Sequence, residues 1–486
     1  MSKVLSGLKP QSVWHNFEEI CQYPHPSKKE EKLAAFILSW AKDKNFTYTR
    51  DKVGNIIVFK PATPGMENRK TVCLQGHIDM VCEKNSDVTF DFDNDPLLLE
   101  IDGDWVKAKG TTLGADNGIG VAIGMALMES NDIPHPPLEL LCTLDEETGL
   151  TGAQNLEQGI LNAGVLLNLD SEEDGAFTIG CAGGQNTSGS FKYEADAIPS
   201  GSVAYQITIK GLKGGHSGIE IHDGRGNAIK FLNRLLYTLN KKIDIRLSSF
   251  NSGNKHNAIP REGFAVVTLP QVKVDEFLSL IKEFDQIIKN EFLSKEPNVQ
   301  VLVEPVALPA KILNKVIQNN IINTFYAMPH GVIRMSPDIA GLVQTSTNLA
   351  IVETSEDEVF VLTSQRSSIE SEKNDVANMV RTTFELGGAI VIQGDGYPGW
   401  QPNVHSPILQ TAKTVFEKMY EKEPKIEAIH AGLECGLIGE KYPGMDMISF
   451  GPNLKDVHSP DEKVQISTVE KCWNFVIEIM KNIPVK

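Results

Sequence analysis

The side chains that could bind metal recur along this chain in five short motifs. They are His77, Asp116, Glu147, Asp170 and His458. Histidine nitrogen and carboxylate oxygen are ligands that zinc takes in proteins, and five of them can hold two ions when one carboxylate bridges both. Glu146 is left over, and a spare carboxylate can act as the base for a metal-activated water. The set therefore indicates a hydrolytic enzyme rather than a structural metal site.

His77 and Asp79 follow an apolar run that is typical of a strand. Alternation along an extended backbone places residues two apart on the same side. A metal-bound histidine usually gives its other ring N–H to a carboxylate, and Asp79 is well placed for that role. On its own the pair fits a polar loop end better than a metal site, so the metal interpretation gains weight only from the other motifs.

Asp116 stands among glycines, just before a run that predicts a helix. Small neighbours leave room for an ion near the backbone, although aspartate also caps helices well. Gly118 and Gly120 begin the pattern of a dinucleotide-binding turn, but Ile123 occupies the place of its third glycine. The sequence therefore disfavours nucleotide binding here.

Glu146 and Glu147 are adjacent at the end of a predicted strand, where two carboxylates repel unless a cation or a shared proton relieves them. As a single motif they also fit an exposed acidic turn. Asp170, which precedes an acidic cluster, and His458 are equally ambiguous alone. It is the combination of two histidines, three carboxylates and one further glutamate that favours catalysis.

The bulk composition excludes several classes of partner. The chain has 486 residues and a formal net charge of −17, with no basic tract, so neither nucleic acid nor an anionic membrane is expected to bind. The N-terminus lacks the apolar core of a signal peptide, and no run of 18 apolar residues follows, which predicts a cytoplasmic protein. The seven cysteines form no C-x-x-C pair, which fits a reducing compartment.

The first segment of the chain alternates between helical and strand-like patterns. A helix is expected over 16–42, and a hairpin turn at Asp102–Gly103. Short apolar runs at 71–75, 138–144 and 165–169 each end at or beside a polar residue. Parallel strands of an open α/β sheet present functional groups at their carboxyl ends in this way.

The middle of the chain has a different rhythm, which predicts two similar α+β units over 187–388. The α/β rhythm resumes over 389–486, and His458 lies there, far from the other candidate ligands. One site can include all five only if 1–186 and 389–486 fold together. The expected fold is therefore α/β: a discontinuous catalytic domain with a mixed, mostly parallel sheet flanked by helices, and an inserted lid domain over 187–388.

In combination, the motifs resemble those of the di-zinc aminoacylase and carboxypeptidase superfamily of metallopeptidases, and within it the aminoacyl-histidine dipeptidase branch. The residues that carry this resemblance are Gln75–Val81, Thr111–Gly118 and Asp145–Gly149. The resemblance implies two divalent ions bridged by Asp116. It assigns His77 and Asp170 to one ion and Glu147 and His458 to the other, with Glu146 as general base and Asp79 orienting His77. Zinc is favoured, while cobalt and manganese suit the same ligands.

The resemblance also assigns substrate binding to the middle domain. His216, within Gly214–Gly218, resembles the histidine that meets the developing oxyanion in this family. Asn257 and Arg366 are further candidates. The arginine suits a peptide carboxylate, which it can hold with two parallel hydrogen bonds. The backbone at Gly432 is expected to line the pocket. Members of the family dimerise through the lid, which predicts a homodimer, and the alternative is that a doubled lid provides the same contact within one chain.

The expected reaction is hydrolysis of the amide bond of Xaa-His dipeptides, including β-alanyl-histidine. A hydroxide shared by the two ions would attack the carbonyl, with Glu146 as its base. The preference for histidine is implied by the resemblance alone. Two alternatives remain: deacylation of N-acyl amino acids by the same site, and a non-catalytic metal-binding scaffold, against which the spare Glu146 argues.

Overall fold

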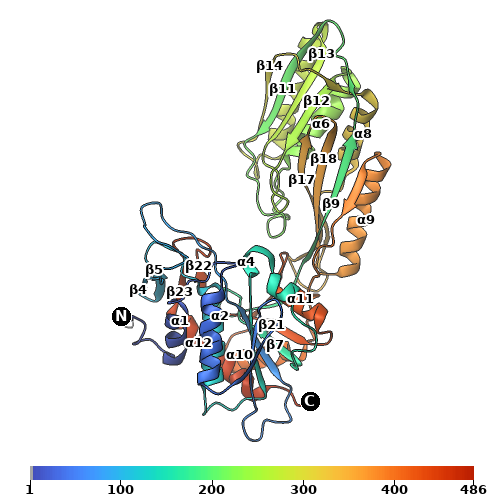
Figure 1. The fold of residues 1–486 in the computed structure, drawn as a ribbon. Coiled ribbons are helices and arrows are strands. Elements are labelled where there is room, and N and C mark those ends of the chain that lie inside the picture. Colours follow the sequence, from blue (N-terminus) through green and yellow to red (C-terminus); the bar gives the residue numbers. More distant parts are fainter. Residues whose placement is uncertain (1–3) are drawn as a thin grey trace. The chain divides into compact units, whose positions relative to one another are not determined.

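The computed structural model describes residues 4–486, and the chain divides into two compact units (Figure 1). Unit 1 contains the residues up to Cys181 together with Trp400–Ala428 and Leu433–Lys486. Unit 2 contains Ala182–Gly399 and Ile429–Gly432. Among the described residues, no helix is both long and apolar enough to cross a bilayer. The catalytic and lid roles of the segments stay predictions.

An eight-stranded sheet forms the centre of unit 1. Its order is β1 (Thr47–Arg50), β2 (Ile56–Lys60), β6 (Leu138–Thr143), β3 (Val72–His77), β7 (Val165–Asn168), β21 (Asp446–Ser449), β8 (Ala176–Cys181) and β20 (Lys425–Ile429). The four strands from β6 to β21 pair in parallel, while β2 and β8 join them antiparallel. Every residue of β3 and β7 is buried, as expected of central parallel strands. The predicted α/β class with a mixed sheet is confirmed, with parallel pairing at its centre.

Helices flank this sheet. They are α1 (Gln11–Ile20), α2 (Glu31–Asp43), α3 (Ala115–Glu129), the short α4 (Glu146–Gly149) and α5 (Thr151–Gln154), then α10 (Pro407–Tyr420), α11 (Glu434–Lys441) and α12 (Ile466–Asn482). Glycines let α3 approach the strands closely. A side chain on Gly120 would place its Cβ 2.5 Å from the carbonyl oxygen of Leu169, and one on Gly124 would come 2.5 Å from Leu140. This close packing brings the start of α3, with Asp116, to the strand ends.

The single helix predicted over 16–42 is wrong. The chain forms α1 and α2 with a loop between them, and this loop contains Pro24 and Pro26. Proline has no N–H to donate and clashes with the preceding helical turn, so it interrupts the helix. The loop then runs beside the end of β3, where Pro26 forms a bridge with Met80.

A smaller four-stranded sheet joins the two ends of the chain within unit 1. Its order is β22 (Leu454–Lys455), β23 (Lys463–Gln465), β5 (Trp105–Ala108) and β4 (Leu99–Asp102). The hairpin predicted at Asp102–Gly103 is confirmed, since Asp102 faces Trp105 across it. Antiparallel pairing of β23 with β5 places the late segment beside residues that precede α3.

Unit 2 is built on a nine-stranded sheet. Its order is β14 (Gln300–Val306), β11 (Ser202–Lys210), β13 (Gly263–Pro270), β12 (Arg246–Ser252), β17 (Val343–Thr354), β18 (Glu358–Ser367), β9 (Gly183–Lys192) and β19 (Ile390–Gln393), and β16 (Gly331–Met335) pairs with β17. Two halves meet where β12 pairs with β17. Read from its outer edge toward this junction, each half has the strand order fourth, first, third, second along the chain when β16 is left aside, so the halves share one topology.

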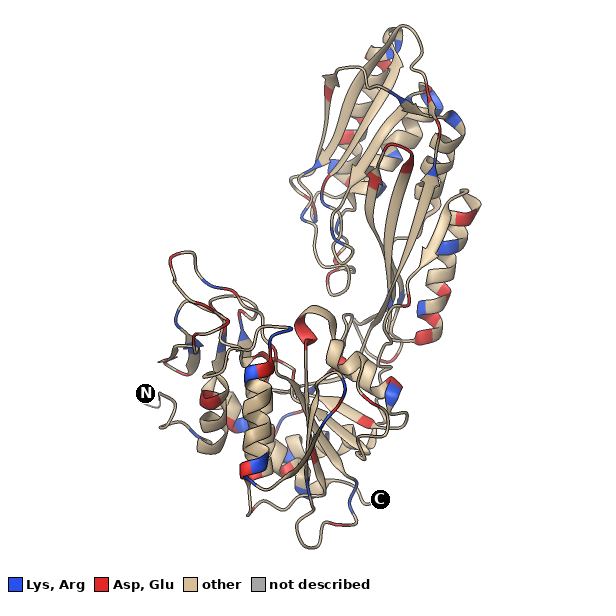
Figure 2. Cartoon of the chain, in the orientation of Figure 1, with Lys and Arg blue, Asp and Glu red and all other residues tan. Residues whose placement is uncertain are grey.

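Four helices accompany this sheet: α6 (Ala228–Lys242) and α7 (Val274–Glu291) in the first half, α8 (Lys315–Ala327) and α9 (Glu370–Leu386) in the second. Phe250, Phe325 and Phe384 are among the fully buried side chains of its core. Acidic and basic residues are interspersed along α9 in Figure 2, and Arg381 donates to Glu385 one turn later.

Candidate metal centre

All five predicted ligands lie in unit 1, and the structure brings them together. Three follow parallel strands of the sheet: His77 ends β3, Glu147 lies in α4 just after β6, and Asp170 comes two residues after β7. Asp116 is in the first turn of α3, and His458 lies in the loop between β22 and β23. Their ligand atoms form two groups of three that share Asp116.

The first group joins His77, Asp116 and Asp170. Nε2 of His77 lies 3.1 Å from Oδ1 of Asp116 and 3.4 Å from Oδ1 of Asp170. Oδ1 of Asp170 is buried and accepts no hydrogen bond from any described residue. A buried carboxylate oxygen that accepts no hydrogen bond is costly, and a cation bound between it and His77 would satisfy it.

The second group joins His458, Asp116 and Glu147. Nε2 of His458 lies 3.2 Å from Oδ2 of Asp116 and 3.0 Å from Oε2 of Glu147. The two carboxylate oxygens of Asp116 therefore face different histidines. This is the arrangement expected of a carboxylate that contributes one oxygen to each of two ions.

Asp79 organises both the histidine and the glutamates. Nδ1 of His77 lies 3.1 Å from the main-chain oxygen of Asp79 and 3.4 Å from its carboxylate, so the proton on Nδ1 is directed away from the site. The carboxylate of Asp79 also accepts from Ser27 Oγ at 2.7 Å and from the N–H groups of Glu146 and Glu147 at 2.9 and 3.2 Å. Asp79 thus fixes the tautomer of His77 and the start of α4 together.

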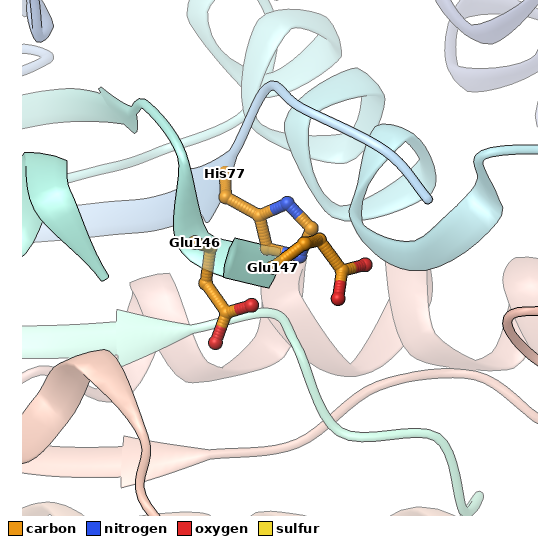
Figure 3. A group of neighbouring side chains, drawn as sticks. All are labelled: His77, Glu146 and Glu147. Carbon is orange, nitrogen blue, oxygen red and sulfur yellow. The ribbon is translucent and has the colours of Figure 1, made fainter. Parts of the chain in front are cut away.

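Glu146 lies beside these groups but outside the two triads that share Asp116. Figure 3 shows its carboxylate and that of Glu147 extending in different directions past the ring of His77. Burial raises the pKa of Glu146 well above its usual value, and the negative charge of Asp170 adds to the rise, although the charge of His77 opposes it. A carboxyl with a raised pKa accepts a proton readily, which suits a general base.

The electrostatics of the triads show how strongly the groups interact. Burial acts to raise the pKa of Asp116, but hydrogen bonds from His458 and His77 outweigh it and hold the pKa well below its usual value. Burial raises the pKa of Asp170 to about 6. Hydrogen bonds to Asp116 and Glu147 raise the pKa of His458 to about 10. Paired imidazoles and carboxylates of this kind form a donor set that divalent ions match.

The donor set fits two divalent ions. Each triad offers one imidazole nitrogen and two carboxylate oxygens, and Asp116 supplies one oxygen to each. Three protein ligands leave positions open for water and substrate, as in catalytic rather than structural sites. The unsatisfied oxygen of Asp170 supports the same conclusion from an independent direction.

Another acidic group, formed by Glu30, Asp79 and Asp145, has its own partners. Glu30 accepts from the N–H of Lys28 at 2.8 Å and of Asp145 at 3.0 Å, and the hydroxyls of Thr148 and Thr151 donate to Asp145. Asp145 has φ +49°, a region that non-glycine residues rarely adopt. The group therefore holds the turn that presents Glu146.

Sequence reasoning missed Glu462. Its carboxylate accepts from four consecutive backbone N–H groups: Leu113 at 2.7 Å, Gly114 at 3.1 Å, Ala115 at 2.8 Å and Asp116 at 3.4 Å. Because Glu462 follows His458 by four residues, it ties the loop of one candidate ligand to that of another. In the sequence it follows Asp461 and looks like part of an exposed acidic loop, yet it is only 2% exposed.

The predicted substrate-binding residues lie in unit 2. Nδ1 of His216 accepts from the N–H groups of Gly218 and Ile219 at 3.1 and 3.2 Å, so its proton is on Nε2. Burial lowers the pKa of His216, and the charge of Arg366 adds to this, which keeps the ring neutral. The main-chain oxygen of Asn257 accepts from the N–H of Ser217 at 2.8 Å, and the next residue, Ala258, forms a bridge with His216.

Arg366 lies in β18 and is 6% exposed. It donates to the hydroxyl of Tyr397 at 3.1 Å, while its Nε has no partner among the described residues. Gly432 lies against the same tyrosine, since a Cβ there would be 3.0 Å from the ring. Arg366, Tyr397 and Gly432 thus form one neighbourhood, and a buried guanidinium with a free donor is suited to an anionic group.

Both the sequence and the fold of the chain are similar to those of known proteins. The chain matches the model of Peptidase family M20/M25/M40 over residues 73–482. It is 46% identical over 482 residues to the cytosol non-specific dipeptidase of Escherichia coli (strain K12), covering 99% of each. A crystal structure of aminoacylhistidine dipeptidase from Vibrio alginolyticus superposes with a TM-score of 0.94 at 46% identity, covering 99% of this chain and 98% of that one. An aminopeptidase from Bacillus cereus shares the fold, with a TM-score of 0.58 at 15% identity over 98% of this chain and 99% of the other. The resemblance drawn from the sequence motifs is confirmed.

Proposed function

The chain belongs to Peptidase family M20/M25/M40 and is a peptide hydrolase, and we propose that it hydrolyses dipeptides, with Xaa-His dipeptides such as β-alanyl-histidine among its substrates. Two relatives that align with nearly the whole chain at 46% identity are named dipeptidases, which supports this substrate class. The observation that carries the proposal is the pair of triads sharing Asp116, with Glu146 beside them and outside both.

We assign the metal centre as follows. His77, Asp116 and Asp170 would hold one divalent ion, and Asp116, Glu147 and His458 the other. Zinc fits this set of nitrogen and oxygen ligands best, although cobalt and manganese accept the same ligands. Bound there, the ions would supply Lewis acidity, which lowers the pKa of a water and polarises the scissile carbonyl.

Proton transfer would be carried out by the side chain of Glu146. Glu146 would take a proton from the attacking water, because its carboxylate lies beside His77 and Glu147 and belongs to neither triad that shares Asp116. It then returns that proton to the leaving amine. With an ion at Nε2, Asp79 would keep the remaining proton of His77 on Nδ1, and it accepts from the backbone N–H of Glu146.

We also assign substrate binding to four residues of unit 2. His216 carries a proton on Nε2, which suits a carbonyl or oxyanion acceptor. Arg366 has a buried, unpartnered N–H that suits the terminal carboxylate of a dipeptide. The backbone at Gly432 and the side chain of Asn257 complete the assignment.

The test is a hydrolysis assay with purified protein. Free histidine should be released from β-alanyl-histidine and from alanyl-histidine, a chelator should abolish this, and added zinc, cobalt or manganese should restore it. N-acetylhistidine serves as the competing substrate. Acetate release from it without histidine release from the dipeptides would identify a deacylase. No turnover of either substrate by protein carrying two ions per chain would identify a non-catalytic scaffold.

Cytoplasmic location and homodimerisation through unit 2 are part of the same proposal. The relative from Escherichia coli is named as a cytosol enzyme.

The edge strand β19 of unit 2 exposes Ile390 and Ile392, which are 61% and 67% exposed, and Leu386 before it is 85% exposed. Apolar side chains on a sheet edge suit a contact with a second copy. Light scattering of the purified chain and of an Ile390→Lys, Ile392→Lys variant would test it, since a dimer built on this edge should become a monomer.

A further inference from the structure

Behind the metal centre, a chain of buried hydrogen bonds crosses four adjacent strands of unit 1. Gln75 in β3, Asn168 in β7 and Ser449 in β21 are direct neighbours in register. Nδ2 of Asn168 donates to Oε1 of Gln75 at 2.6 Å, and the hydroxyl of Ser449 donates to Oδ1 of Asn168. The hydroxyl of Ser171 lies 2.8 Å from that of Ser449. All three strand residues are at most 1% exposed.

This series of hydrogen bonds ends at Glu434, the first residue of α11. Nε2 of Gln75 donates to Oε2 of Glu434 at 2.6 Å, and the hydroxyl of Thr143 in β6 donates to the same oxygen at 2.7 Å. Glu434 is 1% exposed, and its other oxygen, Oε1, has no partner among the described residues. The proposed mechanism gives this buried carboxyl no role.

The direction of the hydrogen bonds follows from the chemistry of the last member. A carboxylate can only accept, so Gln75 must turn its NH2 group toward Glu434 and its carbonyl toward Asn168. Asn168 must then donate to Gln75 and accept from Ser449. One carboxylate thus determines the orientation of two buried amides on neighbouring strands.

The same strand ends deliver the candidate ligands. His77 follows Gln75 by two residues, and Asp170 follows Asn168 by two. Thr143 ends β6, directly before the turn that carries Glu147. We propose that Glu434 is a positioning residue for the metal centre: by accepting from Gln75 and Thr143, it holds the carboxyl ends of β3, β6 and β7 in the spacing that the ligands need. This inference rests on the proposed metal centre.

A matched control exists in the same strand. Glu139 of β6 is another buried carboxyl, 2% exposed, and it accepts from the N–H groups of Asn162 and Ala163 at 2.8 and 3.2 Å. It pairs in register with Cys73, four residues before His77, so its removal perturbs the same two strands away from the ligands. A loss of affinity specific to Glu434 would therefore not be a general effect of deleting a buried carboxyl.

The experiment compares Glu434→Ala, Glu434→Gln, Thr143→Val and Glu139→Ala with the wild type. Cobalt and zinc affinity is measured by competition with a chromophoric chelator, the visible spectrum of the cobalt protein is recorded, and the melting temperature of each metal-free variant is measured. Glu434→Ala should bind about tenfold more weakly and show a changed cobalt spectrum, as loss of an outer partner of a metal site commonly does. Glu434→Gln keeps an acceptor oxygen for Gln75 and Thr143, so it should recover most of the affinity. Glu139→Ala should bind as the wild type does.

Several results would overturn the inference. Wild-type affinity in Glu434→Ala, no recovery in Glu434→Gln, or an equal loss in Glu139→Ala would each do so while leaving the metal centre itself intact. Should Glu434→Ala fail to fold, Thr143→Val decides, because it removes one donor to Glu434 and should still weaken binding. A wild-type chain that binds no divalent ion would defeat the proposed metal centre and this inference together.

Discussion

Replacing Glu462 by alanine should loosen the start of α3 and, through it, the candidate metal centre. The carboxylate accepts from the N–H groups of residues 113–116, and two of these bonds, to Leu113 and Ala115, are short at 2.7 and 2.8 Å. Leu113 and Ala115 are both 0% exposed. Alanine supplies no acceptor, so these N–H groups would be left buried and unpaired.

The expected cost follows from those two short bonds. A buried donor that loses its acceptor costs about 1–3 kcal/mol, so two of them amount to about 4 kcal/mol. The longer bonds to Gly114 and Asp116, at 3.1 and 3.4 Å, add less. Whole domains have free energies of unfolding of about 5–15 kcal/mol, so the variant should lose a large fraction of the stability of unit 1.

The assay can report on unit 1 alone, because all five tryptophans, Trp14, Trp40, Trp105, Trp400 and Trp473, belong to it. Urea unfolding of the metal-free protein is followed by tryptophan fluorescence. Asp461→Asn is the control, since it changes an exposed neighbouring charge and should stay within about 0.5 kcal/mol of the wild type. If Glu462→Ala unfolds at the same urea concentration as this control, the four N–H contacts do not hold the loop, and the reasoning is refuted.

Three further predictions concern the centre and unit 2. Glu146→Gln should keep two bound ions per chain by elemental analysis while kcat falls by about 10²–10⁴-fold, since only the base is lost; near-normal kcat would remove Glu146 from that role. Asp116→Ala should lose both tightly bound ions, and retention of two would defeat the bridging assignment. Burial, with the charge of Arg366 next, lowers the pKa of His430 to about 3, below its ordinary 6.5. Between these pH values the folded state therefore binds fewer protons than the unfolded state. The free energy of unfolding is unaffected by His430 above pH 6.5, and it decreases as the pH falls below 6.5 because protonation of His430 favours the unfolded state. The stability of the wild type relative to His430→Gln should rise by about 1.4 kcal/mol per pH unit in that window, measured by urea unfolding with circular dichroism; a difference that does not change with pH would contradict it.

The sequence predicts the parts of the centre that depend on local pattern. An apolar run followed at once by a polar residue indicates a buried parallel strand with a functional group at its end, and this holds for β3 with His77 and for β7 with Asp170. The helix predicted across Pro24 and Pro26 does not form, because the apolar periodicity continues through two residues that have no N–H to donate. The loop found there supplies Ser27, which donates to Asp79.

The supporting carboxylates could not be predicted, because their partners are remote in sequence. Glu462 accepts from residues 346 to 349 positions earlier, and Glu434 from Gln75, 359 positions earlier. Nothing in the local pattern distinguishes Glu462 from its exposed neighbour Asp461, since both stand in an acidic loop. Burial of a charged group is decided by which segments pack around it, and that information is in the tertiary structure alone.

The position of His458 in the candidate metal centre follows from strand register. Lys463 of β23 pairs with Lys107 of β5 in antiparallel fashion, so residues before 463 run alongside residues after 107. The first of these is Glu462, which meets the N–H groups of 113–116, and four residues earlier His458 meets Asp116. A shift of one residue in this pairing would turn alternate side chains to the opposite face and displace both groups from Asp116. The imidazole of His458 is therefore positioned by two linked constraints, the β23–β5 pairing and the carboxylate of Glu462. A deletion in the loop between His458 and Glu462 should reduce metal affinity, even though every candidate ligand remains.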